Sequence, residues 1–445
     1  MKKEKKRNKP SKEIPLGFVD RKEKELLVRD FIISNIKEIM IKYGFQYLET
    51  PSFEYSDSIG KFLPDKDRPD EGVFSFKDDN KWLSLRYDLT APLARYVAKN
   101  YLEIPKPFKR YQLGTVWRNE KPGPGRFREF LQFDADFVGT KSSLADAELC
   151  VMISEILTKC GLNKSDFVIK ISSRKITEEL FKKLNIKDNQ QKLTALRALD
   201  KIDRLGWDSV KELLGEGRKD KSGDFTEGAN LSSNNIEIIE KELKKKTPET
   251  EDLIEIIKIF KDYNFRNFEF DSSIIRGLEY YTGIIFEVNL KFDVKNNKGQ
   301  VIQFGSIGGG GRYDNLINNF GNYDAPATGI SIGLDRLVYA LMQKKDFKIK
   351  QSKPVVICVF DNNSMKEYIN LQLLLREAEI SAEIYPGEGK LKKQMEYANK
   401  INSPAVILYG EDEIKSGKPT LRNLSTGKEK SAEIRELVNE IKKII

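Results

Sequence analysis

The sequence of 445 residues contains no histidine, and this absence excludes several kinds of chemistry. Without an imidazole the chain cannot build Ser–His or Cys–His catalytic pairs, or the common histidine-ligated metal sites. The absence therefore narrows the available chemistry to phosphate electrostatics, carboxylates and tyrosines.

Cysteines and long apolar runs are also scarce. The three cysteines, Cys150, Cys160 and Cys358, form no C-x-x-C pair, so neither a disulfide framework nor a zinc site is indicated. We therefore expect a reducing, cytoplasmic location. Apolar runs such as residues 354–360 have the length of a strand, so no membrane partner is expected. The basic segment 1–16 has no apolar region after it, which predicts a disordered tail and no secretory signal.

The length and composition predict a globular protein of two or three domains. The chain is 39% hydrophobic and 33% charged, with a formal net charge of +9. A charged linker near residue 346 separates a large domain, 17–345, from a smaller one, 353–445. Within the large domain, a Lys/Glu-rich, helix-prone stretch at about 174–265 surrounds a flexible segment and predicts an inserted helical module.

Residues 109–138 carry the strongest local pattern. Leu131, Phe133, Ala135 and Phe137 alternate with Phe130, Gln132, Asp134 and Asp136, as a strand with one core face and one polar face requires. A matching run at 109–118 precedes a loop that holds Pro122, Gly123, Pro124 and Gly125. The pattern predicts a β-hairpin.

Cations gather around the turn of this hairpin, at Arg118, Lys121, Arg126 and Arg128. Guanidinium groups bind phosphate in a bidentate manner, and they lie here near Phe130 and Glu120. The cluster indicates a nucleotide site. An amphipathic hairpin with a solvated face and an ordinary turn is the alternative.

Two segments before the hairpin add further expectations. Apolar positions in 21–43 predict a long amphipathic helix, followed by a strand that Pro51 interrupts. In 83–96 a short strand leads through Asp88 and Thr90 into a helix, and either residue could cap that helix.

Three segments follow the inserted module. Residues 271–288 carry Arg276 in RGLEYYTG before a strand at 284–288. Residues 304–316 place four glycines before Arg312 and Tyr313, which favours close approach to a small substrate. Residues 327–341 predict a strand, a glycine and a helix with Arg336 in its first turn. An arginine there opposes the helix dipole, so a bound anion should compensate it.

The last ninety or so residues alternate strands with helices, at 364–378, 389–401 and 431–443, with a polar hairpin between the last two. Such alternation predicts a mostly parallel sheet covered by helices. A Rossmann-like nucleotide domain is the alternative, although it would lack a glycine fingerprint.

These motifs resemble class II aminoacyl-tRNA synthetases. Arg118, Glu120, Arg126 and Phe130 match the second signature of the class, Arg336 the third, and the helix and strand at 21–55 the first. Residues 83–96 and RGLEYYTG resemble the histidyl-tRNA synthetase family specifically. The resemblance implies an α+β catalytic domain with an antiparallel class II sheet, a helical insertion that holds the tRNA acceptor arm, a C-terminal α/β anticodon-binding domain, and a homodimer.

The same resemblance implies a role for each matching residue. The expected substrates are ATP with Mg²⁺, L-histidine and tRNA(His). Arg118 and Arg276 would flank the α-phosphate, Arg126 would hold the γ-phosphate, Phe130 and Arg336 would sandwich adenine, and Glu120 would accept from its amino group. Asp88, Thr90 and Gln132 would bind the amino group of histidine, and Asp136, Tyr281 and Tyr313 its imidazole. No metal ligand is expected in the protein.

Two rival functions and one hypothesis remain open from the sequence. A regulatory paralogue would lose the ATP-contacting arginines and the C-terminal domain, and a synthetase for threonine, proline or glycine would lack RGLEYYTG. The absence of histidine would allow translation while charged histidine tRNA is scarce, or it reflects compositional drift. Unchanged synthesis after adding a histidine codon, under histidine starvation, would count against the first explanation.

Overall fold

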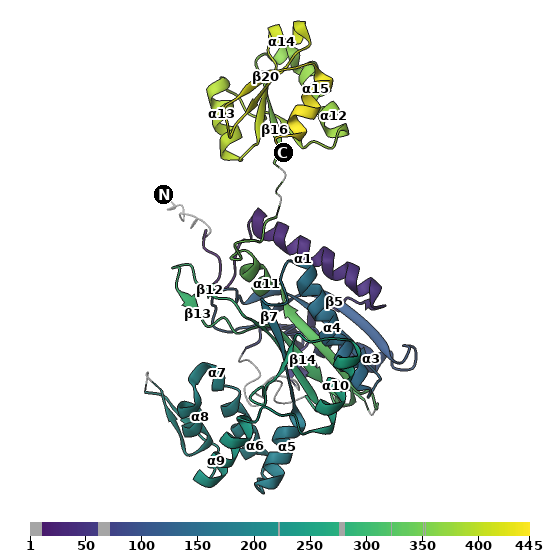
Figure 1. Ribbon diagram of the computed structural model, residues 1–445, viewed down its shortest axis with the longest axis vertical. Helices are drawn as coiled ribbons and strands as arrows, with labels where there is room; N and C mark the ends of the chain where they lie inside the picture. Colours follow the sequence, from purple (N-terminus) through teal and green to yellow (C-terminus); the bar gives the residue numbers. More distant parts are fainter. Residues whose placement is uncertain are drawn as a thin grey trace, which may run out of the picture. The chain divides into compact units, whose positions relative to one another are not determined.

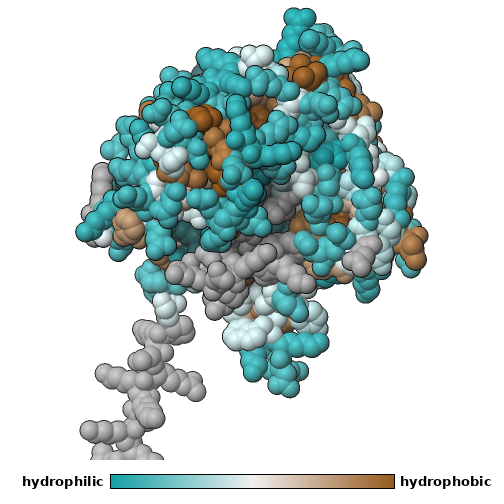
Figure 2. All heavy atoms as spheres, turned by 90° about the horizontal axis from the view of Figure 1, so that it is seen from below, coloured by the Kyte–Doolittle hydropathy of each residue, from teal (hydrophilic) through white to brown (hydrophobic). Residues whose placement is uncertain are grey.

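The computed structural model describes residues 11–60, 72–220, 223–275, 281–321, 323–349, 351 and 353–445. The chain divides into two compact units, Met1–Lys348 and Ile349–Ile445. Among the described residues no helix is both long enough and apolar enough to cross a membrane. On the face drawn in Figure 2, hydrophilic side chains predominate and hydrophobic ones gather in small separate patches.

The larger unit is built on one sheet with the strand order β1-β5-β6-β15-β14-β11-β7-β10. Its strands are β1 (Gln46–Tyr47), β5 (Phe108–Trp117), β6 (Glu129–Val138), β7 (Phe167–Ser173), β10 (Phe268–Phe270), β11 (Ile284–Leu290), β14 (Ser306–Arg312) and β15 (Ala327–Gly333). The described pairs are antiparallel except β1 with β5 and β10 with β7. The expected antiparallel sheet is confirmed at its centre, and a parallel strand lies at each edge.

The predicted hairpin is confirmed as β5 and β6, which pair along their whole lengths. Helices α1 (Glu23–Lys42), α4 (Ser143–Lys159), α10 (Glu251–Asp262) and α11 (Leu334–Leu341) pack on one another and on the sheet (Figure 1). Phe133, Ala135 and Phe137 of β6 are buried, as their spacing predicts. The long N-terminal helix and the strand–helix segment β15–α11 are confirmed as well.

Pro51 separates two strands that join different sheets. Before it, β1 pairs with β5; after it, β2 (Phe53–Tyr55) joins a three-stranded sheet with β4 (Lys81–Leu85) and β3 (Ser75–Asp78). Because proline cannot donate to a ladder, the chain leaves the first sheet at this point. Helices α2 (Ser56–Gly60) and α3 (Thr90–Lys99) contact one another beside this small sheet.

The helical module lies at the lower end of the unit in Figure 1. It contains α5 (Arg174–Lys183), α6 (Asn189–Leu199), α7 (Ile202–Leu205), α8 (Trp207–Leu214) and α9 (Ser233–Leu243). These helices share a hydrophobic cluster that includes Phe181, Leu199 and Ile239. The segment expected to be flexible contains two paired strands, β8 (Gly217–Lys219) and β9 (Phe225–Glu227). Helix α10 packs on α4 instead.

The smaller unit contains a five-stranded sheet of order β17-β16-β18-β19-β20. Its elements are β16 (Val355–Cys358), α12 (Met365–Glu377), β17 (Ala382–Ile384), α13 (Leu391–Lys400), β18 (Ala405–Leu408), α14 (Glu411–Ser416), β19 (Thr420–Asn423), β20 (Glu429–Ser431) and α15 (Ile434–Lys442). The first three strands are parallel, but β18, β19 and β20 pair antiparallel. The three strands of the predicted βαβαβ alternation are thus parallel, as expected, and the predicted polar hairpin is β19 and β20. Because this hairpin joins the same sheet through an antiparallel pair with β18, only part of the sheet is parallel.

Candidate active site

The polar face of the hairpin continues onto the neighbouring strand. In the register of the sheet, Arg110 of β5, Asp136 of β6 and Gly329 of β15 lie side by side. A Cβ atom at position 329 would collide with the carboxylate of Asp136, so only glycine leaves room for that side chain. Backbone register thus places a carboxylate and a guanidinium together in the sheet.

Asp136 is the centre of a buried polar cluster. Its side chain accepts a hydrogen bond from the hydroxyl of Tyr313, and its Oδ2 lies 3.2 Å from Nη2 of Arg110. Arg110 has no exposed surface, and its Nη2 also donates to the carbonyl of Leu89 at 2.9 Å. The structure therefore brings together Asp136 and Tyr313, two of the three residues predicted to bind imidazole.

A second carboxylate, Asp134, lies on the same face two residues away. It is 1% exposed and accepts from Ser331 Oγ at 2.6 Å, Gln132 Nε2 at 2.9 Å and Thr90 Oγ1 at 3.3 Å. These donors come from β15, β6 and the start of α3. Gln132 and Thr90, which are predicted to bind an amino group, thus both donate a hydrogen bond to the carboxylate of Asp134.

Burial dominates the acid–base behaviour of this cluster. It raises the pKa of Asp134 to about 7, with a further rise from Asp136, while Arg110 and Ser331 oppose the shift. Burial also raises the pKa of Asp136, against the opposing effects of Arg110 and Tyr313. The pKa of Tyr313 is raised well above its usual value by burial and by Asp136. Ionisation of both acids would place more buried negative charge in the site than Arg110 balances, so a cationic ligand would favour their ionised forms.

Asp88 acts as a helix cap. Its Oδ1 accepts from the backbone N–H groups of Thr90 and Ala91, at 3.1 and 2.9 Å. These N–H groups at the start of α3 have no partner within the helix. The cap that the sequence allowed at Asp88 is therefore present. Burial raises the pKa of Asp88.

Arg118 lies between two aromatic rings at the turn end of the hairpin. Its guanidinium carbon is 4.4 Å from the ring centroid of Tyr87 and 5.3 Å from that of Phe130, and its Nε donates to the Tyr87 carbonyl. The Tyr87 hydroxyl donates to Glu120 at 2.9 Å. Three of the residues predicted to bind ATP therefore form one group. Arg126 is exposed in the turn, where its backbone pairs with that of Gly123.

Arg336 packs against a ring that the sequence did not single out. Its guanidinium carbon lies 4.3 Å from the ring centroid of Phe304, and Nη2 donates to the Phe304 carbonyl. Asp335 next to it accepts from the backbone N–H of Leu131 at 2.7 Å, which ties the start of α11 to β6 beside Phe130. Asp335 also supplies the negative charge in the first turn that the helix dipole favours, in addition to any bound anion.

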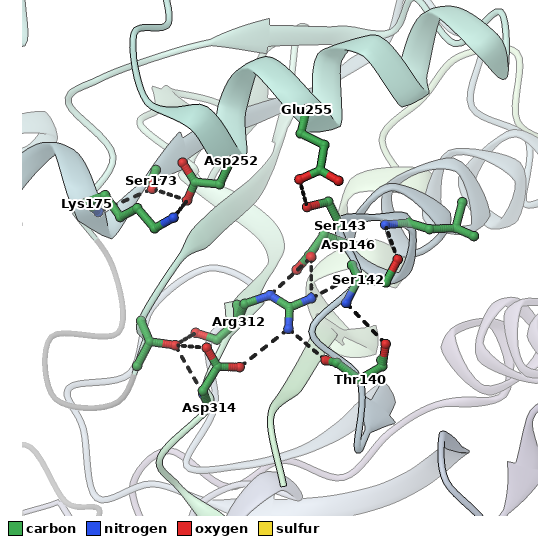
Figure 3. A network of polar contacts seen from close by, with 12 residues as sticks. Thr140, Ser142, Ser143, Asp146, Ser173, Lys175, Asp252, Glu255, Arg312 and Asp314 are labelled. Atoms are coloured by element: carbon green, nitrogen blue, oxygen red, sulfur yellow. Dashed lines mark hydrogen bonds and ion pairs between the residues drawn. The ribbon is translucent and has the colours of Figure 1, made fainter. Parts of the chain in front are cut away.

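The position of Tyr313 depends on its neighbour Arg312. In Figure 3 the guanidinium of Arg312 reaches the start of α4, where Nη2 lies 2.5 Å from Asp146 Oδ2 and Nη1 donates to the Thr140 carbonyl at 2.8 Å. On the other side of the guanidinium, Oδ1 of Asp314 lies 3.4 Å from Nη1 of Arg312. These contacts hold the backbone at the end of β14. They therefore also set the position of Tyr313, the next residue.

Two predicted residues remain to be placed. Tyr281 is half-buried and packs in the same hydrophobic cluster as Tyr313. Arg276 lies outside the described residues.

Sequence reasoning assigned no role to three residues that help to build this site. Arg110, Asp134 and Phe304 all contact predicted site residues. The alternation in β6 already placed Asp134 on the polar face, so the sequence pattern was sufficient to include it among the site residues. The partner of Arg110 depends on hairpin register, and that of Arg336 on a loop distant in sequence.

Comparison with known proteins identifies the sequence families that match. Residues 17–337 match the family model described as histidyl-tRNA synthetase, and residues 354–444 match that of an anticodon binding domain. A histidine–tRNA ligase of Bartonella quintana is 44% identical over 97% of this chain and 92% of its own length. That of Rhizobium meliloti is 44% identical over 98% and 92%.

Similar solved structures agree with these family matches. A histidyl-tRNA synthetase from Nostoc sp. PCC 7120 superposes with a TM-score of 0.75 at 26% identity, covering 98% of this chain and all of that one. A Bacillus halodurans protein, titled an ATP phosphoribosyltransferase regulatory subunit/histidyl-tRNA synthetase, gives 0.66 at 22% identity, over 88% of this chain and 97% of its own. The latter similarity shows a shared fold.

Proposed function

The chain belongs to the histidyl-tRNA synthetase family, and from this membership we propose how its residues carry out the reaction of the family. As a class II aminoacyl-tRNA synthetase it joins L-histidine to tRNA(His) and uses ATP. The match to an anticodon-binding domain in the smaller unit agrees with a tRNA substrate. A cytoplasmic location stays a prediction.

The buried cluster around Asp136 carries the assignment of the histidine site. An imidazole ring needs an acceptor for its N–H and polar partners for the other nitrogen, and a site with such groups rejects apolar competitors strongly. Asp136 supplies the acceptor, and the hydroxyl of Tyr313 donates to Asp136 and holds it in place. Tyr281 packs in the same cluster, and its hydroxyl is the proposed partner of the other ring nitrogen. We assign Asp88, Thr90 and Gln132 to the amino group of the substrate.

The turn end of the hairpin is the proposed ATP site. Arg118 and Arg276 would flank the α-phosphate and Arg126 would bind the γ-phosphate. Phe130 and Arg336 would hold adenine between them, with Glu120 near its amino group. Two contacts support this arrangement: that of Arg118 with the Phe130 ring, and the hydrogen bond from the Leu131 N–H to Asp335, which links β6 to α11. Mg²⁺ would enter with the phosphates, whose oxygens suit its coordination.

Catalysis follows from fixed positive charge. The carboxylate of histidine attacks the α-phosphate and displaces pyrophosphate, which gives histidyl-adenylate, and both reacting groups are anionic. Guanidinium groups held in place before the reaction stabilise the charge that builds up in the transition state. Tyr87 positions Arg118 through its ring and its carbonyl, so little reorganisation is needed. The histidyl-adenylate then passes its acyl group to a ribose hydroxyl of the tRNA and releases AMP.

The small sheet supports a homodimer. Phe53, Tyr55 and Phe76 lie on one of its faces and are 49%, 48% and 43% exposed. The opposite face buries polar Glu54, which pairs with Arg95 at 2.6 Å. A sheet whose aromatic face is the exposed one is typical of an interface. We propose that a second copy of the chain covers this face.

ATP–pyrophosphate exchange with a panel of amino acids tests the proposal. Purified protein should support exchange with L-histidine and not with threonine, proline or glycine, and should then charge tRNA(His). Exchange with another amino acid, or none with histidine, would overturn the substrate assignment. The same protein without added amino acid is the control.

A further inference from the structure

The amino-group subsite contains an acid whose partners show what it does. Asp134 accepts from three side chains on three different elements, and two of these, Thr90 and Gln132, are assigned to the substrate ammonium. Asp88, the acid that the sequence indicated for this charge, already uses one oxygen to cap α3. The burial and bonding of Asp134 therefore call for a separate explanation.

An ammonium group only donates hydrogen bonds, so its site must present acceptors. Threonine hydroxyls and glutamine amides can each donate or accept, and a neighbouring group must settle which they do. An ionised carboxylate settles it, because it can only accept. Asp134 takes the hydroxyl hydrogen of Thr90 and an amide hydrogen of Gln132, and leaves their oxygens to accept. The Oε1 of Gln132 is buried and has no partner among the described residues.

We propose that Asp134 is a positioning residue, which turns Thr90 and Gln132 into acceptors for the α-ammonium of the amino acid and supplies negative charge behind them. This inference rests on the proposed location of the amino-acid site. The opposite polarity is excluded by charge, since the Gln132 oxygen cannot face the carboxylate in place of its NH₂ group without repulsion.

The surrounding charges make this effect depend on pH. Asp136 on the same strand, Asp88 at the start of α3, and Arg110 on β5 face Asp134, while Ser331 donates to it from β15. The pKa of Asp134 is about 7 before the ligand arrives. Below that pH the acid takes up a proton, loses its negative charge and becomes a donor at one oxygen, so it no longer forces Thr90 and Gln132 to accept. The affinity for an ammonium should therefore fall as the pH drops from 8 to 6.

Two histidine analogues separate the ammonium from the ring. L-Histidinol keeps the imidazole and the ammonium, whereas 3-(imidazol-4-yl)propan-1-ol has the same imidazole and alcohol and lacks only the ammonium. Both are measured as competitive inhibitors of histidine in ATP–pyrophosphate exchange, at pH 6 and pH 8. The ammonium lowers the pKa of the neighbouring ring, so the two rings titrate differently. Each inhibitor is therefore compared between the original protein and a variant at the same pH, where the ligand is in the same state.

The substitution Asp134→Asn retains the shape of the side chain and removes its charge. At pH 8 we expect the inhibition constant of histidinol to rise about 10- to 100-fold, as for loss of a charged hydrogen-bonding partner, and that of imidazolylpropanol to change less than about 2-fold. The factor by which the substitution weakens histidinol should be larger at pH 8, where Asp134 is ionised in the original protein, than at pH 6, where it is largely protonated. An equal change for both inhibitors, or no change for either, overturns the inference.

A second variant tests the proposed site independently. Asp136→Asn should weaken both inhibitors to a similar extent, since both carry the ring. If it changes neither, the proposed histidine site is wrong whatever Asp134 does. If Asp134→Asn fails to fold, Ser331→Ala removes one donor to Asp134 and retains the acid. It should then weaken histidinol selectively by a smaller factor, and equal weakening of both inhibitors overturns the inference.

Discussion

The buried acid that orients the amino-group site should lower the stability of the free protein. Asp134 shares a desolvated region with Asp136 and Asp88, and Arg110 is the fully buried cation among them. Asp134→Asn removes one of these charges and keeps an oxygen that can accept from Ser331. We therefore expect the variant to be more stable than the original protein at alkaline pH.

The size of the effect follows from proton linkage. The pKa of Asp134 is about 7 in the folded protein, whereas an unperturbed aspartate, as in the unfolded chain, has a pKa of 3.8. Between these values the folded protein binds more protons than the unfolded chain, so its free energy of unfolding falls as pH rises. One such group contributes at most about 1.4 kcal/mol per pH unit. From pH 5 to pH 7 the carboxylate therefore costs roughly 2 to 3 kcal/mol, and the cost levels off between pH 7 and pH 8.

Thermal unfolding of both proteins at pH 5, 6, 7 and 8, at one ionic strength, measures this difference. The melting temperature of Asp134→Asn relative to the original protein should rise with pH by several degrees and level off near pH 7. Asp324→Asn is a matched control, because the Asp324 side chain is 80% exposed and solvent screens its charge. It should show no such trend.

A difference that stays flat across this pH range would refute the reasoning. It would mean that Asp134 carries the same charge in the folded and unfolded protein at each pH. A relative melting temperature that falls with rising pH would show that Arg110 stabilises the ionised acid more than burial destabilises it. In either case the electrostatic description of the pocket would be wrong.

Three further changes test other parts of the molecule. Arg276→Ala should cost on the order of 2 to 4 kcal/mol in adenylation and spare histidine binding, measured by pyrophosphate exchange and calorimetry; unchanged exchange would contradict the α-phosphate assignment. Phe76→Asp should convert a dimer into monomers in sedimentation, whereas Phe225→Asp, at a ring 62% exposed in the helical module, should not; the reverse pattern would move the interface elsewhere. Arg86→Ala should lower the free energy of unfolding by about 2 to 4 kcal/mol in urea, because the Thr50 and Thr115 carbonyls each lose a donor at 2.7 Å; an unchanged midpoint would show that water replaces it.

The sequence by itself determined the local elements that build the site. Period-two alternation located β6 and its polar face, helical spacing located α1, and Pro51 marked where the chain leaves the main sheet. These features depend on residues a few positions apart, and such signals are complete in the sequence. The matching motifs also indicated the family, because their residues lie close together in the chain.

The tertiary structure alone decided which side chains meet. Hairpin register paired Arg110 with Asp136, and sheet order brought Ser331 to Asp134. A distant loop supplied Phe304 to Arg336. In each case the partner depends on strand pairing or packing across many residues, and a one-residue shift in register would have turned these side chains to the other face of the sheet. Local patterns can show that a strand has a polar face, but only the assembled sheet fixes what that face contains.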